Sequence, residues 1–231
     1  MGVSMMSRLK FAVAAGAASL AAAGPASAAE IFFDSFEAPD VADWAVFQVA
    51  GDGSDWTAEF GTGIEIQDES LGITDAYDGE QYVELDSDFA RGGDAGASGT
   101  NSGMGALVPF VEGRTYDISF AYKPRTDVAD DNIIQLYALA YDGADVDNAV
   151  QLFEVNETTS TLSDWMVYTV SYTALAGFNG IGFAADGIEN SLGGFLDAVS
   201  VSEVPLPAAL PLFLAGVAGF GFAGRKRKAA A

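Results

Sequence analysis

The 231-residue sequence contains no cysteine and no histidine, and each absence excludes a kind of chemistry. Without cysteine the chain forms no disulfide, so its fold has to be held together by its own hydrophobic core. Without histidine it lacks the commonest general base and the commonest transition-metal ligand. Ser-His-Asp catalysis, Cys-His catalysis and zinc chemistry are therefore excluded.

Basic residues are almost absent from the body of the chain. The segment Glu30–Glu203 holds all 33 acidic residues but only four basic ones, which gives it a net charge of −29. A surface of this charge repels nucleic acid and anionic lipid, and it favours solubility and cations. We therefore expect no nucleic-acid partner. The acidic residues indicate either specific calcium sites or general charge for solubility or salt tolerance.

The N-terminus has the three parts of a secretory signal peptide. Arg8 and Lys10 supply positive charge, and the 13 residues 11–23 are uncharged and apolar. Ala26-Ser27-Ala28 then gives the small-x-small pattern of a signal peptidase site. We predict that residues 1–29 are a signal peptide that signal peptidase removes after Ala28 or Ala29. A retained signal anchor is the alternative.

The C-terminus carries a second targeting segment. Residues 205–224 are 20 residues without a charge, about the length that crosses a bilayer as a helix. A basic cluster follows, made of Arg225, Lys226, Arg227 and Lys228. Such a cluster stays cytoplasmic as a stop-transfer signal under the positive-inside rule. We predict a membrane span over about residues 206–224 and a cytoplasmic stop over 225–228.

The tail at residues 204–231 also begins with a motif. That motif is Val204-Pro205-Leu206-Pro207-Ala208. Together with the apolar span and the basic run, it resembles the exosortase-dependent sorting tail, the PEP-CTERM class in its VPLPA form. The resemblance implies export across the inner membrane of a Gram-negative bacterium, transient anchoring by the C-terminal helix and processing by an exosortase. The mature protein would then belong to the cell envelope or the extracellular matrix. An ordinary single-span anchor is the alternative.

The body between the two targeting segments, residues 30–203, is typical of an all-β protein. Short stretches with period-2 alternation are separated by Gly, Asp and Asn, and no long stretch has helical periodicity. The predicted strands are Ile31–Asp34, Trp44–Ala50, Gly63–Gln67, Gln81–Asp86, Thr115–Tyr122, Asn132–Tyr141, Val150–Val155, Met166–Tyr172, Gly180–Ala184 and Gly194–Val201. The longest break, Asp88–Gly103, is rich in glycine and predicts an exposed, mobile loop. This pattern predicts a single two-sheet sandwich.

Four segments of the body occur in an order that resembles exported jelly-roll domains related to carbohydrate-binding modules and galactose-binding-like domains. The segments are Phe33–Pro39 followed by Trp44, Gly79–Asp86, Gly113–Tyr122 and Gly193–Val201. The resemblance implies a two-sheet jelly roll whose first and last strands are adjacent. It also implies one structural Ca²⁺ near the chain ends, with Glu37 and Asp197 as ligands and Asp34 as a weaker candidate. The alternatives are turn chemistry for Asp34 and Glu37, and a polar position on an edge strand for Asp197.

Aromatic side chains are candidates for stacking against sugar rings, because they offer a flat apolar face. Trp44 and Trp165 stand at predicted strand starts, where packing in the core is the expected role. Trp56 follows a turn-like Asp-Gly-Ser-Asp segment, so we expect it to be exposed. Tyr141 precedes Asp142-Gly143, a hairpin signal, and is expected at a sheet edge.

Function remains open among three classes. A glycosidase needs only two carboxylates at a set separation, and in a chain with 33 acidic residues that signal has no specificity. We therefore predict a non-catalytic surface or matrix protein, associated with extracellular polysaccharide or biofilm. A purely structural, calcium-stabilised surface protein is the first alternative. A secreted enzyme that acts on glycosides is the second.

Overall fold

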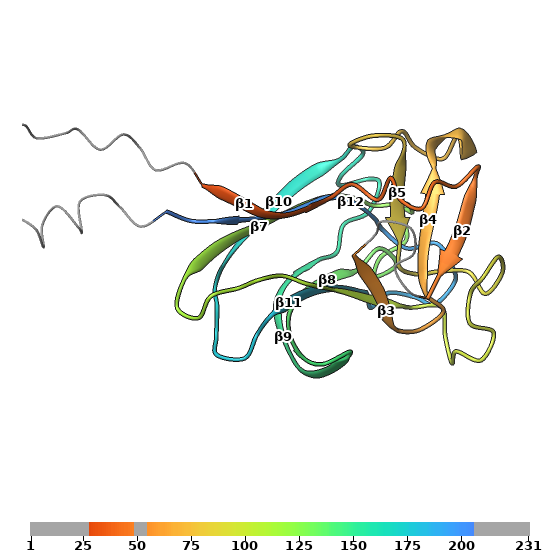
Figure 1. Ribbon diagram of the computed structural model, residues 1–231. Helices are drawn as coiled ribbons and strands as arrows, with labels where there is room; N and C mark the ends of the chain where they lie inside the picture. Colours follow the sequence, from red (N-terminus) through yellow and green to blue (C-terminus); the bar gives the residue numbers. More distant parts are fainter. Residues whose placement is uncertain (1–27, 49–54, 206–231) are drawn as a thin grey trace, which may run out of the picture. The chain divides into compact units, whose positions relative to one another are not determined.

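The computed structural model describes residues 28–48 and 55–205 (Figure 1). These residues belong to one compact unit, Ser27–Pro205. Most of the predicted signal peptide, the motif residues Leu206, Pro207 and Ala208, and the basic cluster 225–228 lie outside the described residues. Within the described ranges, no helix has the length and apolar character to cross a bilayer.

Two antiparallel sheets make up the fold, which confirms the predicted all-β sandwich (Figure 1). The seven-stranded sheet has the order β10-β7-β12-β5-β4-β2, with β1 also paired to β12. The five-stranded sheet has the order β3-β6-β11-β8-β9. The first sheet contains β1 (Ala29–Asp34), β2 (Trp44–Phe47), β4 (Ile64–Asp68), β5 (Gln81–Glu84), β7 (Thr115–Lys123), β10 (Met166–Thr173) and β12 (Phe195–Glu203). The second contains β3 (Trp56–Phe60), β6 (Gly103–Leu107), β8 (Ile134–Asp142), β9 (Asp145–Val155) and β11 (Gly180–Ala185). A short 3-10 helix spans Glu69–Leu71.

The first and last strands lie side by side, as predicted. Their register runs from Ala29 opposite Glu203 to Asp34 opposite Val199, with one irregularity after Glu30. The last strand is hydrogen-bonded along its other side to β7. The described chain therefore begins and ends at neighbouring positions of one sheet.

The hydrophobic core lies between the two sheets and follows the alternation of the strands. On β7 the alternate side chains that point inward are buried, namely Tyr116, Ile118, Phe120 and Tyr122, whereas Asp117 and Ser119 point outward. Trp56 lies in the middle of this core at 1% exposure, with its ring against Phe32, Phe36 and Phe183. The expectation that Trp56 is exposed is therefore wrong.

The reason for this error is the position of a strand boundary. The turn-like residues end at Asp55, and β3 begins at Trp56 with its first side chain pointing into the core. The indole also makes a hydrogen bond to the Asp34 carboxylate, so its polar atom is paired inside the core. The other two tryptophans, Trp44 and Trp165, are partly exposed, which also corrects the expectation that they belong to the core.

Two strands of the five-stranded sheet were not predicted. The first, β3, begins directly after the turn-like segment that ends at Asp55, and β6 begins at the end of the glycine-rich break. That break is only partly exposed, because Thr100 and Ser102 near its end are buried. Glycine and alanine have low β-propensity, so β6 gave no strand signal.

Candidate functional site

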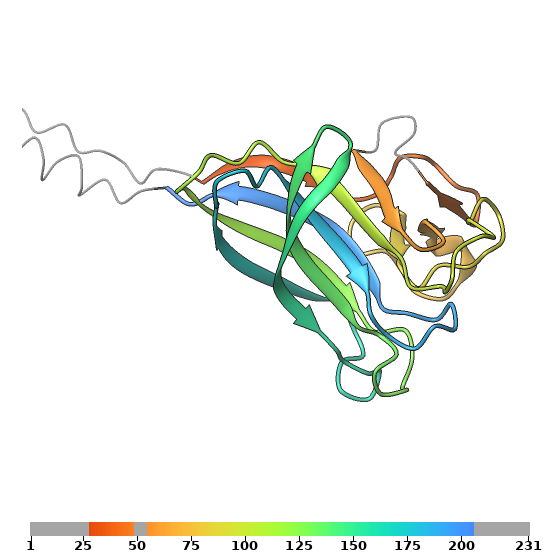
Figure 2. The ribbon, with the colours of Figure 1, turned by 90° about the horizontal axis from the view of Figure 1, so that it is seen from below.

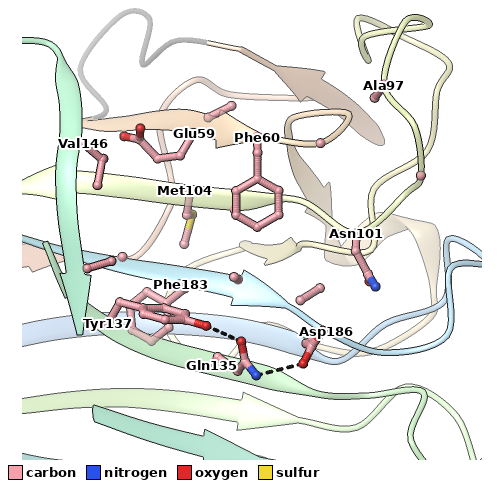
Figure 3. A pocket seen from close by; sticks show the side chains of 18 of the residues that line it. Glu59, Phe60, Ala97, Asn101, Met104, Gln135, Tyr137, Val146, Phe183 and Asp186 are labelled. Carbon is pink, nitrogen blue, oxygen red and sulfur yellow. Dashed lines mark hydrogen bonds between the residues drawn. The ribbon is translucent and has the colours of Figure 1, made fainter. Parts of the chain in front are cut away.

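A groove of about 1180 Å³ lies on the outer face of the five-stranded sheet (Figure 3). Its floor includes Gly103 on β6 with Gly182 and Ala184 on β11. These residues face outward because Ile181 and Phe183, which alternate with them, belong to the core. The walls are the end of β3, the loop that contains residues 94–101, the residues that follow β11, and the β8–β9 hairpin. Figure 2 shows this long hairpin, in green, crossing the front of the sandwich.

Glycine in the floor lets large side chains lie flat against the sheet. A Cβ on Gly103 would come within 2.3 Å of a ring carbon of Phe60, and one on Gly182 within 2.7 Å of the Leu139 side chain. A Cβ on Gly105 would lie 2.0 Å from the Tyr141 hydroxyl. Any side chain at these positions would displace the groups that now cover the backbone. The result is a flat surface on which the Phe60 ring is 53% exposed.

Polar side chains on one edge of the groove form a fixed network. The Tyr137 hydroxyl donates to the carboxamide oxygen of Gln135 (Figure 3). The Gln135 amide nitrogen donates at 2.9 Å to both Glu154 and Asp186. Because both ends of this nearly buried carboxamide are paired, its orientation and that of the Tyr137 ring are defined. The carboxylates keep lone pairs that can accept hydrogen bonds from a ligand.

The charged side chains of the described groove lining are all acidic. This described lining carries five carboxylates and no lysine or arginine. The five are Glu59, Asp94, Asp145, Asp186 and Glu189. Such a site attracts hydroxyl donors and cations and repels anions.

Tyr141 lies beside this groove. Its hydroxyl donates to Glu59 at 2.6 Å, across β11 and β6, and burial together with this bond raises the pKa of the phenol. The predicted hairpin after it is confirmed, with Gly143 at a φ of 69°. The expected edge position is wrong, because β8 has β11 on one side and β9 on the other.

Glu37 and Asp197 both hold the loop 77–81 through its backbone. Glu37 accepts hydrogen bonds from the N–H groups of Glu80 and Gln81, at 3.0 and 2.9 Å. Asp197 accepts from Tyr77 and Asp78 at 2.8 and 3.0 Å. The structure therefore brings the two predicted carboxylates to opposite ends of one five-residue loop.

Asp197 does not stand on an edge strand, so that alternative is wrong. It is fully buried on β12, which lies inside the seven-stranded sheet. Burial raises the pKa of Asp197 to about 7, although three backbone N–H donors act to lower it. Asp34 makes a local turn, in which its carboxylate accepts from the N–H of Phe36 at 2.7 Å.

Calcium at these carboxylates stays a prediction. Ca²⁺ takes six to eight oxygen ligands, so Glu37 and Asp197 would need backbone carbonyls to complete a site. In residues 28–48 and 55–205 there is no group of three or more acidic, histidine or cysteine side chains placed to hold a metal. The N–H donors of the loop already satisfy both carboxylates in part, which fits a structural role without a metal equally well.

Sequence reasoning missed the groove residues Phe60, Gln135 and Tyr137. The sequence did carry a signal for Gln135 and Tyr137. Every second residue of this strand from Ile134 to Ala140 is apolar, and Gln135 and Tyr137 alternate with these residues, so they lie on the opposite face. No such signal marked Phe60, which follows from the register of β3 against β6.

No protein-family model and no curated protein matches the chain. Among solved structures, the chain is similar to the CBM22-1 xylan-binding domain of Paenibacillus barcinonensis Xyn10C. The identity is 16%, the TM-score 0.46, and the match covers 79% of this chain and 100% of that one. The tandem CBM22-1-CBM22-2 domain of the same protein gives 16% and 0.48, covering 80% of this chain and 50% of that chain. The K1 cleaved adhesin domain of Lys-gingipain from Porphyromonas gingivalis W83 gives 18% and 0.46, covering 75% and 98%.

Proposed function

We propose that this chain is an exported, non-catalytic surface or matrix protein that binds an uncharged polysaccharide in the groove of its five-stranded sheet. The observation that carries the proposal is the exposed Phe60 ring on a flat glycine floor, beside the fixed network of Gln135 and Tyr137. A sugar ring has an apolar face of C–H groups and an edge of hydroxyls. The groove offers a partner for each.

The size and charge of the groove support a neutral polymer as ligand. Its volume of about 1180 Å³ lies above the roughly 300–1,000 Å³ of pockets for drug-sized molecules. Carboxylates accept hydrogen bonds from sugar hydroxyls, but they repel the carboxylates of a polyuronate. The net charge of −29 on residues 30–203 extends this repulsion over the domain.

A binding role is favoured over catalysis by the position of the perturbed carboxyl groups. A glycosidase needs a carboxylic acid of raised pKa facing its substrate. Burial raises the pKa of Asp34, Glu65, Glu84 and Asp197, and none of these lines the groove.

We also propose that signal peptidase removes residues 1–29 and that an exosortase processes the tail 204–231, so the protein reaches the envelope or matrix of a Gram-negative bacterium. The limits of the described domain support this proposal. Its first strand starts at Ala29, and its last strand ends at Glu203, directly before the sorting motif. Cleavage after Ala28 would leave β1 whole, cleavage after Ala29 would remove only its first residue, and the sorting motif begins where β12 ends.

Affinity electrophoresis of the exported protein in gels that contain soluble xylan, mixed-linkage glucan or polygalacturonate tests the binding function. We expect retardation by at least one neutral polymer and none by polygalacturonate. Phe60→Ala should weaken binding about tenfold, as expected for loss of an aromatic anchor. Phe33→Ala is the matched control, because Phe33 is 50% exposed but lies on β1 of the other sheet. Equal binding by wild type and Phe60→Ala contradicts the proposal.

A second candidate is a purely structural surface protein stabilised by calcium. The observation that favours it is the shared loop 77–81, which Glu37 and Asp197 fix at a point where β12 and the segment after β1 meet. A protein of this kind would bind none of the polymers above.

A further inference from the structure

A second aromatic surface lies away from the groove, around Trp165. We call it the Trp165 surface and define it by three partly or largely exposed side chains on the outer face of the seven-stranded sheet. They are Tyr77, Trp165 and Val167. Tyr77 is 48% exposed, although its ring contacts another aromatic residue. Clustered exposed apolar side chains on a soluble domain mark an interaction site.

The aromatic rings of this surface are held in place before any ligand binds. The Trp165 indole N–H donates to the carbonyl of Asp75 at 2.9 Å. The same ring makes edge contacts with Tyr77 at 6.2 Å and with the buried Tyr82 at 6.1 Å between centroids. A ring fixed in this way loses little conformational entropy when a ligand stacks on it.

The Trp165 surface lies on the side of the sandwich opposite to the groove. Tyr82 on β5, against which Trp165 packs, alternates with Val83 of the core and so points outward from the seven-stranded sheet. Phe195 on β12 packs on Tyr82 at 4.8 Å and alternates with Leu196 of the core. The groove occupies the outer face of the other sheet.

The charge of the domain decides among the occupants of this surface. A second copy of the chain, or an anionic membrane, meets the repulsion of a domain that carries a net charge of −29. An uncharged sugar ring meets none, and it needs polar groups close to the aromatic faces. Three polar side chains supply such groups. Lys123 donates to the Thr74 hydroxyl at 2.9 Å, and Asp78 adds a carboxylate next to Tyr77 in the chain.

We propose that the Trp165 surface is a second carbohydrate-contacting site, at which Tyr77 and Trp165 stack against an uncharged polysaccharide. Together with the groove it makes one domain bivalent, with its two sites on opposite faces. A bivalent domain can join two polymer chains. Once one site has bound, the other site meets the polymer at a high effective concentration. The cross-linking role rests on the proposed function of the groove, but the second site does not.

Turbidity and binding of soluble mixed-linkage glucan or xylan by the exported protein test this inference. We expect wild type to cross-link the polymer and scatter light. Tyr77→Ala and Trp165→Ala should each abolish the scattering while the groove still binds. Tyr77→Ala guards against a folding defect, because its side chain is the more exposed of the two, and thermal melting checks both variants. Phe60→Ala should also lower the scattering, because it weakens the groove about tenfold while binding at the second site is retained.

Other outcomes would rule out the second site, the groove, or both. If Tyr77→Ala and Trp165→Ala scatter like wild type while Phe60→Ala removes binding, the groove stands and the second site is wrong. If Phe60→Ala changes nothing and Tyr77→Ala removes binding, the second site stands and the groove is wrong. If wild type is a dimer in sedimentation without polymer and Tyr77→Ala is a monomer, the Trp165 surface is a self-association site and the inference fails. If wild type binds no polymer tested, both sites are wrong.

Discussion

Replacing Trp56 with alanine is the sharpest test of the core. Its ring is 1% exposed and contacts three aromatic rings, Phe32, Phe36 and Phe183, at centroid distances of 5.5, 5.8 and 5.9 Å. Truncating a buried aromatic residue costs about 3–5 kcal/mol, because transfer free energy is lost and a cavity is left behind. For a domain of this size each kcal/mol shifts the melting temperature by about 2–4 °C. We therefore expect a decrease of about 10 °C.

Thermal unfolding of residues 30–203, followed by circular dichroism, measures this decrease. Trp165→Ala is the matched control, since it removes the same side chain from a partly exposed position with two ring contacts. It should lower the melting temperature by a clearly smaller amount. If Trp56→Ala costs no more than Trp165→Ala, Trp56 is not a core residue, and the packing described for β3 is wrong.

Three further predictions concern charge, calcium and sorting. Burial raises the pKa of Glu84 well above its ordinary value, although Arg125 forms an ion pair with it. The stability contributed by the protonated carboxyl is therefore present at low pH and is lost as the pH rises above the ordinary range of a glutamate towards the folded-state pKa. In urea unfolding, the stability of Glu84→Gln should depend less on pH over this rise than that of wild type, and an equal dependence contradicts this. If Glu37 and Asp197 bind Ca²⁺, calcium should raise the melting temperature more than magnesium does at equal ionic strength. Glu37→Gln and Asp197→Asn should lose this difference, whereas the control Asp130→Asn should keep it. Equal responses to both ions mean that no specific site exists. Mass spectrometry of the mature protein from its host should find residues 225–228 removed, and their presence would show a plain anchor.

The strand pattern could be predicted from the sequence where the two faces differ in polarity. Thr115–Tyr122 alternates apolar and polar side chains, and β7 follows it within one residue at its end. The strands β3 and β6 could not be predicted in this way, because β6 consists mainly of small residues and its partner begins directly after a turn-like segment. Their place in the sheet is set by pairing with each other and with β11.

The candidate groove was hidden for the same reason. It forms where glycines on β6 and β11 leave space, and glycine in a sequence predicts turns more readily than the floor of a binding site. The loop 77–81, held by Glu37 and Asp197, could be predicted in part. The carboxylates were singled out by resemblance, but their backbone N–H partners leave no trace in the sequence.

If the C-terminal tail anchors the protein before it is processed, as the proposed sorting implies, the pairing of β1 with β12 has a mechanical consequence. The end of β12 is paired on both sides, because Ser202 lies opposite Glu30 on one side and Asp117 on the other. Just beyond it, the N–H of Val204 donates to Thr115 at 2.8 Å, and Glu203 forms an ion pair with Arg114 at 2.8 Å. Tension applied along this strand would act on two ladders of hydrogen bonds in shear, all at once, so the domain would resist a pull between a polymer chain and its anchor far better than a strand peeled from an edge.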